Sequence, residues 1–564
     1  MKSWQERLAA AGLLALFAGL VAAGLPHHSP TVDEFAHLPA GYHYWKSGDF
    51  SLYAKNPPLV KMIATLPWLI LQPARPDRFS KGQAWRYATE FMRLNQADYI
   101  RLFSWGRVPI IFLALLLGVG IWRGSRRRYG PVGGLISLSC FCLCPNFLAH
   151  SGLATVDVGA SLFFGAAVFA GLWYFERPSW PRAGLAGTAL GLAQLAKFTS
   201  IFLIPLFLLG AALAPRLARE PEGKGLLHPK SYSSLRRLLS LTVILVITWL
   251  ILWAGYRFEW DPYAFSDLYF RSQSLKWAQT RFDFLPLPVP PSYLDGFDAQ
   301  LADAEHNKFP NYLFGRWYEG QKWYYFPFAI AVKTPIPILL AFLAALFFRR
   351  RDLSTTRSFW SWSPQEVALI VVMIVVYLGL TWRNQLQIGL RYLLPLYPLA
   401  YVLIGRLGGP GFRQRFGRGY VWVLSGLGVW LLIGTLRIHP HYLAYFNELG
   451  GGPDRGYRIL LDSNLDWGQD LPGLADYLKE HQIAKVHLAY FGHVDPAIYG
   501  INYEPFQEPN PPGLTAISVM YLMGFPYKIT YTQPQSSPPL EEIAPYRNRQ
   551  PYAKIGYSIF LYQD

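Results

Sequence analysis

Two adjacent carboxylates, Asp33 and Glu34, are the first residues whose type and spacing could do chemistry. They lie in the run TVDEFAH at 31–37, a few residues after an apolar stretch at 8–25. Placing a carboxylate pair at a membrane edge costs free energy unless water solvates the pair or the pair has a function. A positioned carboxylate can act as a general base. A solvated loop pair is the alternative. A zinc-protease motif does not fit, because that motif begins with His.

Asp157 is a second candidate carboxylate. It closes the run HSGLATVD at 150–157 and begins the apolar stretch 156–175. If Asp157 and Asp33 face the same cavity, they could act as base and orienting group, or share a metal ion. Asp157 could instead cap the helix that follows it, through the amides of the first turn.

Basic residues are expected on the same side as these carboxylates: Lys55, Lys61, Lys197, Lys333 and Arg391. The first two flank the NPP run at 56–58, and the others lie at or near ends of apolar stretches. A single Lys or Arg at such an end often reaches lipid headgroups. Five of them around a carboxylate site would suit an anionic phosphate or pyrophosphate at the membrane surface.

The composition indicates a membrane protein as the scaffold for these residues. Of the 564 residues, 52% are hydrophobic and only 15% are charged, whereas a soluble protein carries about 25% charged residues. Mean hydropathy is only +0.17, so a sizeable part of the chain lies in water. The high aromatic content, with Trp 20, Tyr 35 and Phe 37, excludes disordered and coiled-coil classes.

Eleven apolar stretches are long enough, or nearly so, to cross a bilayer. If the N-terminus is cytoplasmic and the sides alternate, 22 of the 52 Lys and Arg fall in short inner segments, which is the positive-inside pattern. The net charge of +17 is therefore mostly explained by Lys and Arg in the inner segments, and no nucleic-acid partner is expected. The predicted spans are 8–25, 104–122, 131–149, 156–175, 183–197, 200–214, 238–254, 328–348, 365–382, 392–405 and 420–436.

The same topology leaves three long segments on the outer face, 26–103, 255–327 and 437–564. The first predicts an interfacial helix at Leu59–Leu71 and a surface helix at Gln83–Phe103. The last predicts a small α/β domain with a helix at Leu471–His481, and its β-prone runs are Lys485–Phe491, Thr515–Tyr521 and Ile555–Tyr562. The expected domains are therefore a transmembrane unit, 1–436, and an extracytoplasmic C-terminal unit, 437–564.

Two features of the sequence are interpreted as structural. The stretch 8–25 could be a cleaved signal peptide, but ten further spans favour an uncleaved anchor. Cys140, Cys142 and Cys144 fall within one predicted span. Their spacing scatters them around a helix, so neither disulfides nor a zinc site is expected.

The chain resembles GT-C glycosyltransferases, most closely the family of protein O-mannosyltransferases and the lipid A aminoarabinose transferase (glycosyltransferase family 39). The resemblance covers about 30–405 and depends on Asp33-Glu34, GDF at 48–50, NPPLVK at 56–61, TVD at 155–157, LAK at 195–197 and RYLLP at 391–395. This sequence has Asn56 where the mannosyltransferases have His. It also places Lys55 one residue further from Pro-Pro than the aminoarabinose enzymes do.

The resemblance implies an all-α polytopic membrane enzyme of the GT-C type, with about eleven transmembrane helices and a small outer α/β domain. It implies a polyprenyl-phosphate sugar as donor and an acceptor hydroxyl on a protein, lipid or glycan. Asp33 would be the base of an inverting transfer, with Glu34 beside it and Asp157 in support. Lys55, Lys61, Lys197, Lys333 and Arg391 would be candidates for the donor phosphate. Further substrate contacts are predicted at four residues, His37, Tyr42, Asn56 and Tyr392.

Several alternatives stay open from the sequence. A lipid-linked-sugar transporter or flippase would be favoured by inverted repeats and by charges at mid-membrane, and neither is found. A non-catalytic membrane scaffold is the other alternative. No cofactor is certain: an Asp-Glu pair near phosphates can hold Mg²⁺ or Mn²⁺, and Lys or Arg can neutralise phosphates instead. The expected location is the cell (plasma or inner) membrane, among its lipids, with a cytoplasmic N-terminus and an extracytoplasmic C-terminal domain.

Overall fold

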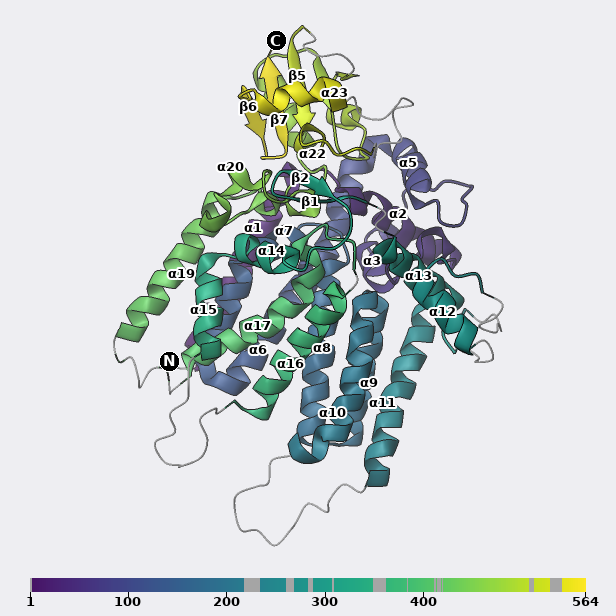
Figure 1. The fold of residues 1–564 in the computed structure, drawn as a ribbon, viewed down its shortest axis with the longest axis vertical. Coiled ribbons are helices and arrows are strands. Elements are labelled where there is room, and N and C mark those ends of the chain that lie inside the picture. Colours follow the sequence, from purple (N-terminus) through teal and green to yellow (C-terminus); the bar gives the residue numbers. More distant parts are fainter. Residues whose placement is uncertain are drawn as a thin grey trace.

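A computed structural model of the chain has a mostly helical part and a small sheet near the C-terminus (Figure 1). The structure describes residues 3–217, 234–259, 268–282, 288–306, 309–347, 362–382, 384–409, 412, 417, 419–506, 512–527 and 540–563. Six described helices are long and apolar enough to cross a membrane. The chain is therefore a multi-pass membrane protein, as the composition predicts.

Helical segments occupy all eleven predicted spans. The elements are α1 (Ser3–Gly24), α6 (Tyr99–Cys142), α7 (Pro145–Ser151), α8 (Asp157–Glu176), α9 (Trp180–Ala196), η4 (Phe198–Phe202), α10 (Leu203–Leu217), α11 (Ser234–Gly255), α14 (Tyr325–Lys333), α15 (Ile336–Phe347), α16 (Pro364–Thr381), η6 (Leu390–Leu396), α17 (Tyr397–Ile404), η7 (Gly405–Gly408) and α19 (Gly419–Arg437).

Several of the predicted spans are not single straight helices. The stretch 104–122 lies wholly within α6 and the stretch 131–149 partly within it, and α6 is broken between them at Gly130, where φ is +82°. Such a φ is accessible to glycine and rare for other residues. The α14–α15 pair bends by 114°, and counting it as one span raises the number of candidate spans from six to seven. The predicted spans at 183–197, 200–214 and 392–405 form shorter helices, as their length indicates.

The first outer segment is largely helical. Its elements are η1 (Leu25–His27), α2 (Val32–Ser47), η2 (Ser51–Tyr53), α3 (Leu59–Ala64), α4 (Trp68–Leu71), α5 (Ala84–Leu94) and η3 (Gln96–Asp98). The predicted interfacial helix 59–71 is thus two short helices with Pro67 at the start of the second. The predicted surface helix 83–103 is divided among α5, η3 and the start of α6.

The second outer segment folds into short elements: α12 (Gln273–Phe282), α13 (Pro291–Glu305) and the antiparallel pair β1 (Asn311–Leu313) and β2 (Arg316–Tyr318). Gln387, which lies between α16 and η6, donates its backbone N–H to Asn311 Oδ1. Tyr318 donates its hydroxyl to Gln387 Oε1. These bonds attach the β-hairpin to the segment that leads to Arg391.

The C-terminal part contains a mixed five-stranded sheet of order β4-β3-β5-β7-β6. The strands β3, β4 and β5 are parallel, and β7 is antiparallel to both β5 and β6. The predicted run 555–562 contains a hairpin rather than one strand. The elements are η8 (Tyr442–Ala444), η9 (Glu448–Gly450), α20 (Pro453–Gly456), η10 (Asp462–Asn464), α21 (Leu471–Glu480), β3 (Val486–Ala489), η11 (Pro496–Tyr499), β4 (Tyr503–Pro505), β5 (Leu514–Ser518), α22 (Val519–Leu522), α23 (Leu540–Ile543), η12 (Ala544–Asn548), β6 (Ala553–Ile555) and β7 (Ile559–Gln563).

The long helices run side by side, and the sheet lies at one end of them (Figure 1). The short outer helices α2, α3, α5 and α13 lie at this same end, whereas the N-terminus lies toward the opposite end (Figure 1). That the N-terminus and the sheet lie on different sides of a membrane stays a prediction.

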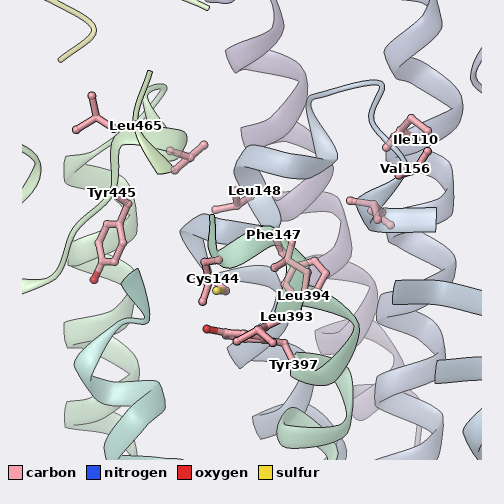
Figure 2. Close-up of a cluster of buried hydrophobic side chains, with 14 of the residues drawn as sticks. Ile110, Cys144, Phe147, Leu148, Val156, Leu393, Leu394, Tyr397, Tyr445 and Leu465 are labelled. Carbon is pink, nitrogen blue, oxygen red and sulfur yellow. The ribbon is translucent and has the colours of Figure 1, made fainter. Parts of the chain in front are cut away.

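A buried apolar cluster packs the helices together next to two of the predicted site residues, Asp157 and Arg391. Figure 2 shows Val156 beside Ile110, and Leu393, Leu394 and Tyr397 gathered around Phe147 and Cys144. Val156 precedes Asp157 in the chain, and Leu393 follows Arg391 by two residues. All three cysteines are buried and free, as the spacing predicts. Close packing of this kind fixes the backbone from which the charged side chains project.

Candidate functional site

Four predicted residues meet in one cluster of alternating charge. Arg391 Nη1 contacts Asp33 Oδ2 and lies 4.0 Å from Asp157 Oδ2, and Lys197 Nζ donates to Asp157 Oδ1 at 2.7 Å. We call Asp33, Asp157, Lys197 and Arg391 the charge cluster. Its two carboxylates and two cations come from segments more than 350 residues apart, since 358 positions separate Asp33 from Arg391.

Asp33 is placed by the start of α2. Thr31 is the N-cap residue, and its side chain and the side chain of Glu34 form a capping box with the backbone. Asp33 thus lies in the first turn, where the helix dipole favours negative charge. Burial by itself would raise the pKa of Asp33, but the neighbouring Arg391 outweighs burial and holds the pKa below its ordinary value. Asp33 is therefore a carboxylate at neutral pH.

Glu34 points away from the charge cluster into a buried bonding network. Its carboxylate accepts from Arg107 Nε at 2.8 Å and Arg107 Nη2 at 2.9 Å, and also from the backbone N–H groups of Thr31 and Ala154. The Glu34 side chain has no solvent exposure. With every oxygen occupied, it has no free acceptor for a substrate proton. The structure thus places the Glu34 carboxylate against Arg107 and two backbone amides, and the catalytic role expected from the sequence stays a prediction.

Asp157 orients cations rather than capping α8. It is the first residue of α8, and Val156, the N-cap residue, makes no side-chain capping bond. Besides Lys197, the Asp157 carboxylate accepts from Thr155 Oγ1 at 3.1 Å and lies 3.9 Å from His150 Nδ1. The charged partners place the carboxylate in the cluster, so the capping alternative is not supported.

Trp467 covers Arg391 on the side of the C-terminal segment. The Arg391 guanidinium lies 4.4 Å from the centre of the Trp467 ring, and the Trp467 carbonyl accepts from Val32 N at 3.1 Å. Stacking on an aromatic face holds a guanidinium in place. Trp467 was not among the site residues predicted from the sequence, although it lies against Arg391.

His37 lies one turn after Asp33 on the same side of α2. Its ring is buried and 5.4 Å from the ring of Tyr53, and within the described part of the chain neither ring nitrogen has a hydrogen-bond partner. Burial, only partly offset by the charge of Asp33, lowers the pKa of His37 to about 4. The neutral ring presents one donor and one acceptor beside the charge cluster, which suits the predicted substrate contact.

Tyr392 borders the charge cluster, and Tyr42 and Asn56 lie elsewhere. The ammonium of Lys197 is 5.3 Å from the centre of the Tyr392 ring. Tyr42 packs against Trp68 instead, with its ring 5.9 Å away. Asn56 adopts φ +63°, a left-handed conformation that Asn tolerates better than most residues, and its carbonyl accepts from Lys61. The structure places Tyr42 and Asn56 away from the charge cluster, and their substrate contacts stay predictions.

Three of the five predicted phosphate ligands are bonded outside the charge cluster. Lys61 is buried and donates to the Tyr44 hydroxyl and to the carbonyls of residues 53, 55 and 56, and burial lowers its pKa well below the ordinary value. Lys55 pairs with Asp303 on α13. Lys333 donates to the carbonyls of Leu443 at 2.9 Å and Asn464 at 2.6 Å. Each of these three lysines is bonded outside the charge cluster, so of the five predicted phosphate ligands only Lys197 and Arg391 belong to it.

The glycine run at 450–452 forms a turn. Asn447 Oδ1 accepts from the backbone N–H groups of Leu449 and Gly450, which closes the turn. Gly451 and Gly452 have φ of +71° and +73°. Asn447 also donates to the carbonyls of Ala331 and Thr334 at the bend between α14 and α15.

Asp462 is a third carboxylate near Arg391 and Asp33, and sequence reasoning did not assign it a role. Burial raises its pKa to about 6, although Arg391 opposes the change. The folded protein therefore binds a proton at Asp462 between about pH 4 and 6 that the unfolded chain has already released. Stability falls as the pH rises through this window, because the carboxylate must then be buried with its charge.

We expect Asp462→Asn to raise the stability of the protein at pH 8 by about 1–2 kcal/mol, since partial exposure lets solvent screen some of the charge penalty. Asn also suits the φ of +58° at this position. The measurement is the free energy of unfolding of both proteins in mixed micelles at pH 4, 6 and 8. An equal pH dependence in the two proteins would contradict the assignment of the proton to Asp462.

The Asp33-Glu34 pair does not fit a divalent cation. Glu34 is saturated by Arg107 and backbone amides, and Asp33 is paired with Arg391, whose positive charge stands where an ion would bridge the two cluster carboxylates. Mg²⁺ and Mn²⁺ need several oxygen ligands free to converge on one point. Arg391 and Lys197 supply the positive charge at this place instead.

One family model matches part of the chain. Residues 102–253 match the family described as dolichyl-phosphate-mannose-protein mannosyltransferase. The match covers α8, Asp157 and Lys197, and it lies inside the range 30–405 over which the motifs resemble that family. The predicted resemblance is therefore confirmed for these residues. No significant match to a curated protein is found.

Three solved structures show a weak overall similarity to this chain. ArnT from Cupriavidus metallidurans bound to undecaprenyl phosphate is 14% identical, with 100% of this chain and 98% of that chain covered and a TM-score of 0.47. The Saccharomyces cerevisiae Pmt1-Pmt2 complex bound to its sugar donor is 17% identical over 45% of this chain and 33% of that chain, with a TM-score of 0.29. The oligosaccharyltransferase of Archaeoglobus fulgidus is 12% identical over 78% and 55%, with a TM-score of 0.35. All three TM-scores are below 0.5, so the overall likeness is loose.

Proposed function

We propose that this protein is a membrane glycosyltransferase that moves a sugar from a polyprenyl-phosphate donor to an acceptor hydroxyl on the extracytoplasmic face. Three independent features support this function: the charge cluster, the helices that can hold a lipid donor in the bilayer, and the family match over 102–253. The N-terminus would be cytoplasmic and the C-terminal sheet extracytoplasmic, in the cell membrane.

Arg391 and Lys197 would bind the donor phosphate. Both side chains are largely buried, yet Arg391 keeps one donor, Nε, that has no hydrogen-bond partner among the residues the structure describes. A phosphate entering this place would replace Asp33 as a partner of Arg391. Guanidinium groups bind phosphate oxygens through two parallel bonds, which makes the exchange favourable.

Asp33 would act on the acceptor. Once the phosphate has taken over Arg391, the Asp33 carboxylate can accept the proton of the acceptor hydroxyl. The acceptor oxygen then forms a bond to the anomeric carbon while the bond from that carbon to the phosphate oxygen breaks. The electron pair leaves with the polyprenyl phosphate. Attack from the face opposite the phosphate inverts the anomeric configuration.

Asp157 would orient the cations through this exchange. It holds Lys197 at 2.7 Å and faces Arg391, so both cations stay in place when Asp33 turns to the acceptor. Preorganised charges of this kind stabilise the phosphate as it leaves, without the cost of moving at the moment of reaction. Asp157 is therefore proposed as a positioning residue.

The observation that carries the proposal is that Arg391 lies between two carboxylates at the same end of the helices as the C-terminal sheet. The test uses the full chain in lipid nanodiscs, a panel of polyprenyl-phosphate hexoses and pentoses, and membrane extract as acceptor. Mass spectrometry should detect free polyprenyl phosphate and a new glycosylated product. An intact donor throughout the panel, or donor transported across a bilayer unchanged, would contradict the proposal.

We expect Arg391→Lys to lower turnover by about 10²–10³-fold, the usual cost of removing one charge-stabilising donor. Lys keeps the charge but loses the planar fork and the stacking on Trp467. Binding of polyprenyl phosphate should weaken in parallel. Arg101→Lys is the matched control, because Arg101 is an exposed residue of the same outer region and pairs only with Asp98 among the described residues. Equal activity of the two variants would show that Arg391 does not bind the phosphate.

A further inference from the structure

Two histidines and an aspartate converge at the junction between the helices and the C-terminal part. Among the described residues, His28, His441 and Asp470 each offer one ligand atom, and these atoms lie within 4.8 Å of one another. His28 Nδ1 is 3.9 Å and His441 Nδ1 is 3.6 Å from Asp470 Oδ1. Both distances are too long for hydrogen bonds, and neither Nδ1 atom has a hydrogen-bond partner in the described part of the chain.

The protonation of His28 leaves its inner nitrogen free to bind an ion. His28 Nε2 lies 3.1 Å from the carbonyl of Pro440. A carbonyl only accepts, so Nε2 carries the proton and Nδ1 presents a lone pair toward Asp470. Metal-binding histidines commonly donate their other N–H to a backbone carbonyl, which fixes the orientation of the ring.

The two carboxylate oxygens of Asp470 have different surroundings. Its Oδ2 accepts from Ser558 Oγ at 2.6 Å and from Gln469 Nε2 at 2.9 Å, which leaves Oδ1 toward the histidines. Gly556 makes room for this carboxylate, because a Cβ there would lie 2.1 Å from Asp470 Cγ. The side chain of Asp470 is 1% exposed and that of His441 is 29% exposed. The carboxylate is thus held in place from behind, and an ion can enter past His441.

We propose that His28, His441 and Asp470 form a binding site for a divalent transition metal, with Zn²⁺ as the fitting ion. Two imidazole nitrogens and one carboxylate oxygen are a common zinc donor set, with a water molecule as fourth ligand. Ligand atoms of a tetrahedral zinc site lie about 3.3–3.5 Å apart, as bond lengths near 2.1 Å require. The three ligand atoms, which lie within 4.8 Å of one another in this structure, would move closer together when the ion binds.

The ion would join three distant segments near the charge cluster. His28 follows α1, His441 follows α19 and Asp470 precedes α21. Beside the site, Ser29 N donates to the Gln469 carbonyl at 2.8 Å and Ser29 Oγ donates to the Gly468 carbonyl at 2.7 Å. The segment that contains Ser29 continues to Asp33, and the segment that contains Gly468 and Gln469 directly follows Trp467. A metal here would therefore hold the outer segment that carries Asp33 against the C-terminal segment that covers Arg391.

The test measures Zn²⁺ bound to the full chain in nanodiscs after removal of metal with a chelator. We expect one equivalent in the wild type, and binding at least about tenfold weaker in His28→Gln and in His441→Gln. His439→Gln is the matched control, because His439 lies in the same segment but its Nδ1 faces the Tyr442 hydroxyl at 3.0 Å. It should bind Zn²⁺ like the wild type. No bound Zn²⁺ in the wild type, or equal binding in all four proteins, would overturn the proposal.

A second measurement keeps the test valid if the His28 variant fails to fold. Co²⁺ in a tetrahedral site absorbs strongly in the visible range, and the half-exposed His441 can be replaced with little effect on packing. We expect this absorption in the wild type and its loss in His441→Gln. Zn²⁺ should also raise the thermal unfolding midpoint of the wild type and of His439→Gln but not of His441→Gln. Identical spectra and midpoint shifts in wild type and His441→Gln would contradict a site at these residues.

Discussion

The Asp33→Asn variant is expected to lose sugar transfer by about 10²–10⁴-fold, the range that removal of a positioned general base produces. Asn keeps the size of Asp but cannot take a proton from the acceptor. Arg391 loses its ionic partner at this position, so polyprenyl phosphate should bind as well as in the wild type or more tightly. The measurements are turnover of the polyprenyl-phosphate sugar and equilibrium binding of polyprenyl phosphate in nanodiscs.

The combination of these two measurements separates a base from a structural residue. Lost turnover with retained lipid-phosphate binding supports the role of Asp33 as the base. Loss of both would mean that Asp33 only maintains the geometry of the site. Asp98→Asn is the matched control, because Asp98 is a carboxylate of the same outer segment whose side chain is 64% exposed. Its activity should equal that of the wild type, and full activity in Asp33→Asn would remove Asp33 from the mechanism.

The Arg107→Met variant is expected to lose about 3–5 kcal/mol of stability, the cost of removing one partner of a buried ion pair. Arg107 bonds Glu34 twice and also donates to the carbonyls of His28 and Ser29. Its removal leaves the Glu34 carboxylate buried with its charge uncompensated. The free energy of unfolding is measured by titration of the purified protein with sodium dodecyl sulfate in mixed micelles.

The pH dependence of the same variant gives a second test. Burial alone would raise the pKa of Glu34, but Arg107 and the surrounding amides hold the pKa below its ordinary value. A lowered pKa contributes stability above the ordinary pKa of about 4.5. That contribution is lost as the pH falls through the lowered value.

We therefore expect wild type and Arg107→Met to differ most at neutral pH and to approach each other as the pH falls through the lowered pKa of Glu34. Arg101→Met is the matched control on the same helix, α6, with a side chain 64% exposed. It should change stability by less than about 0.5 kcal/mol. A double variant with Glu34→Gln should recover part of the loss, and no recovery would show that the pair is not the cause.

Much of the scaffold could be predicted from local patterns. Apolar length identified the helical segments, and the separate spans predicted at 104–122 and 131–149 match the break of α6 at Gly130, which lies between them. The 114° bend between α14 and α15 was not predicted. This bend depends on how neighbouring helices pack, and hydropathy averaged over a window does not record that packing.

The candidate site was predicted in part. Asp33, Asp157, Lys197 and Arg391 were expected on one side of the membrane, and the structure brings these four together. Lys55, Lys61 and Lys333 were expected beside them, but they bond elsewhere. The charge of a lysine and its expected side of the membrane do not distinguish a phosphate ligand from a lysine that bonds two segments to each other. Both roles require a lysine on the same face.

Hydropathy, segment length and charge bias act along the chain within a few tens of residues, so the sequence alone was enough to predict a membrane protein, its long segments outside the spans, and its acidic and basic candidates. Which charges pair depends on the folded structure. It turned Glu34 toward Arg107, left Asp33 to Arg391, and brought Trp467 over the guanidinium. The strength of an ion pair or a stacking contact depends on a distance of a few ångströms between segments hundreds of residues apart, and that distance exists only after the helices have packed.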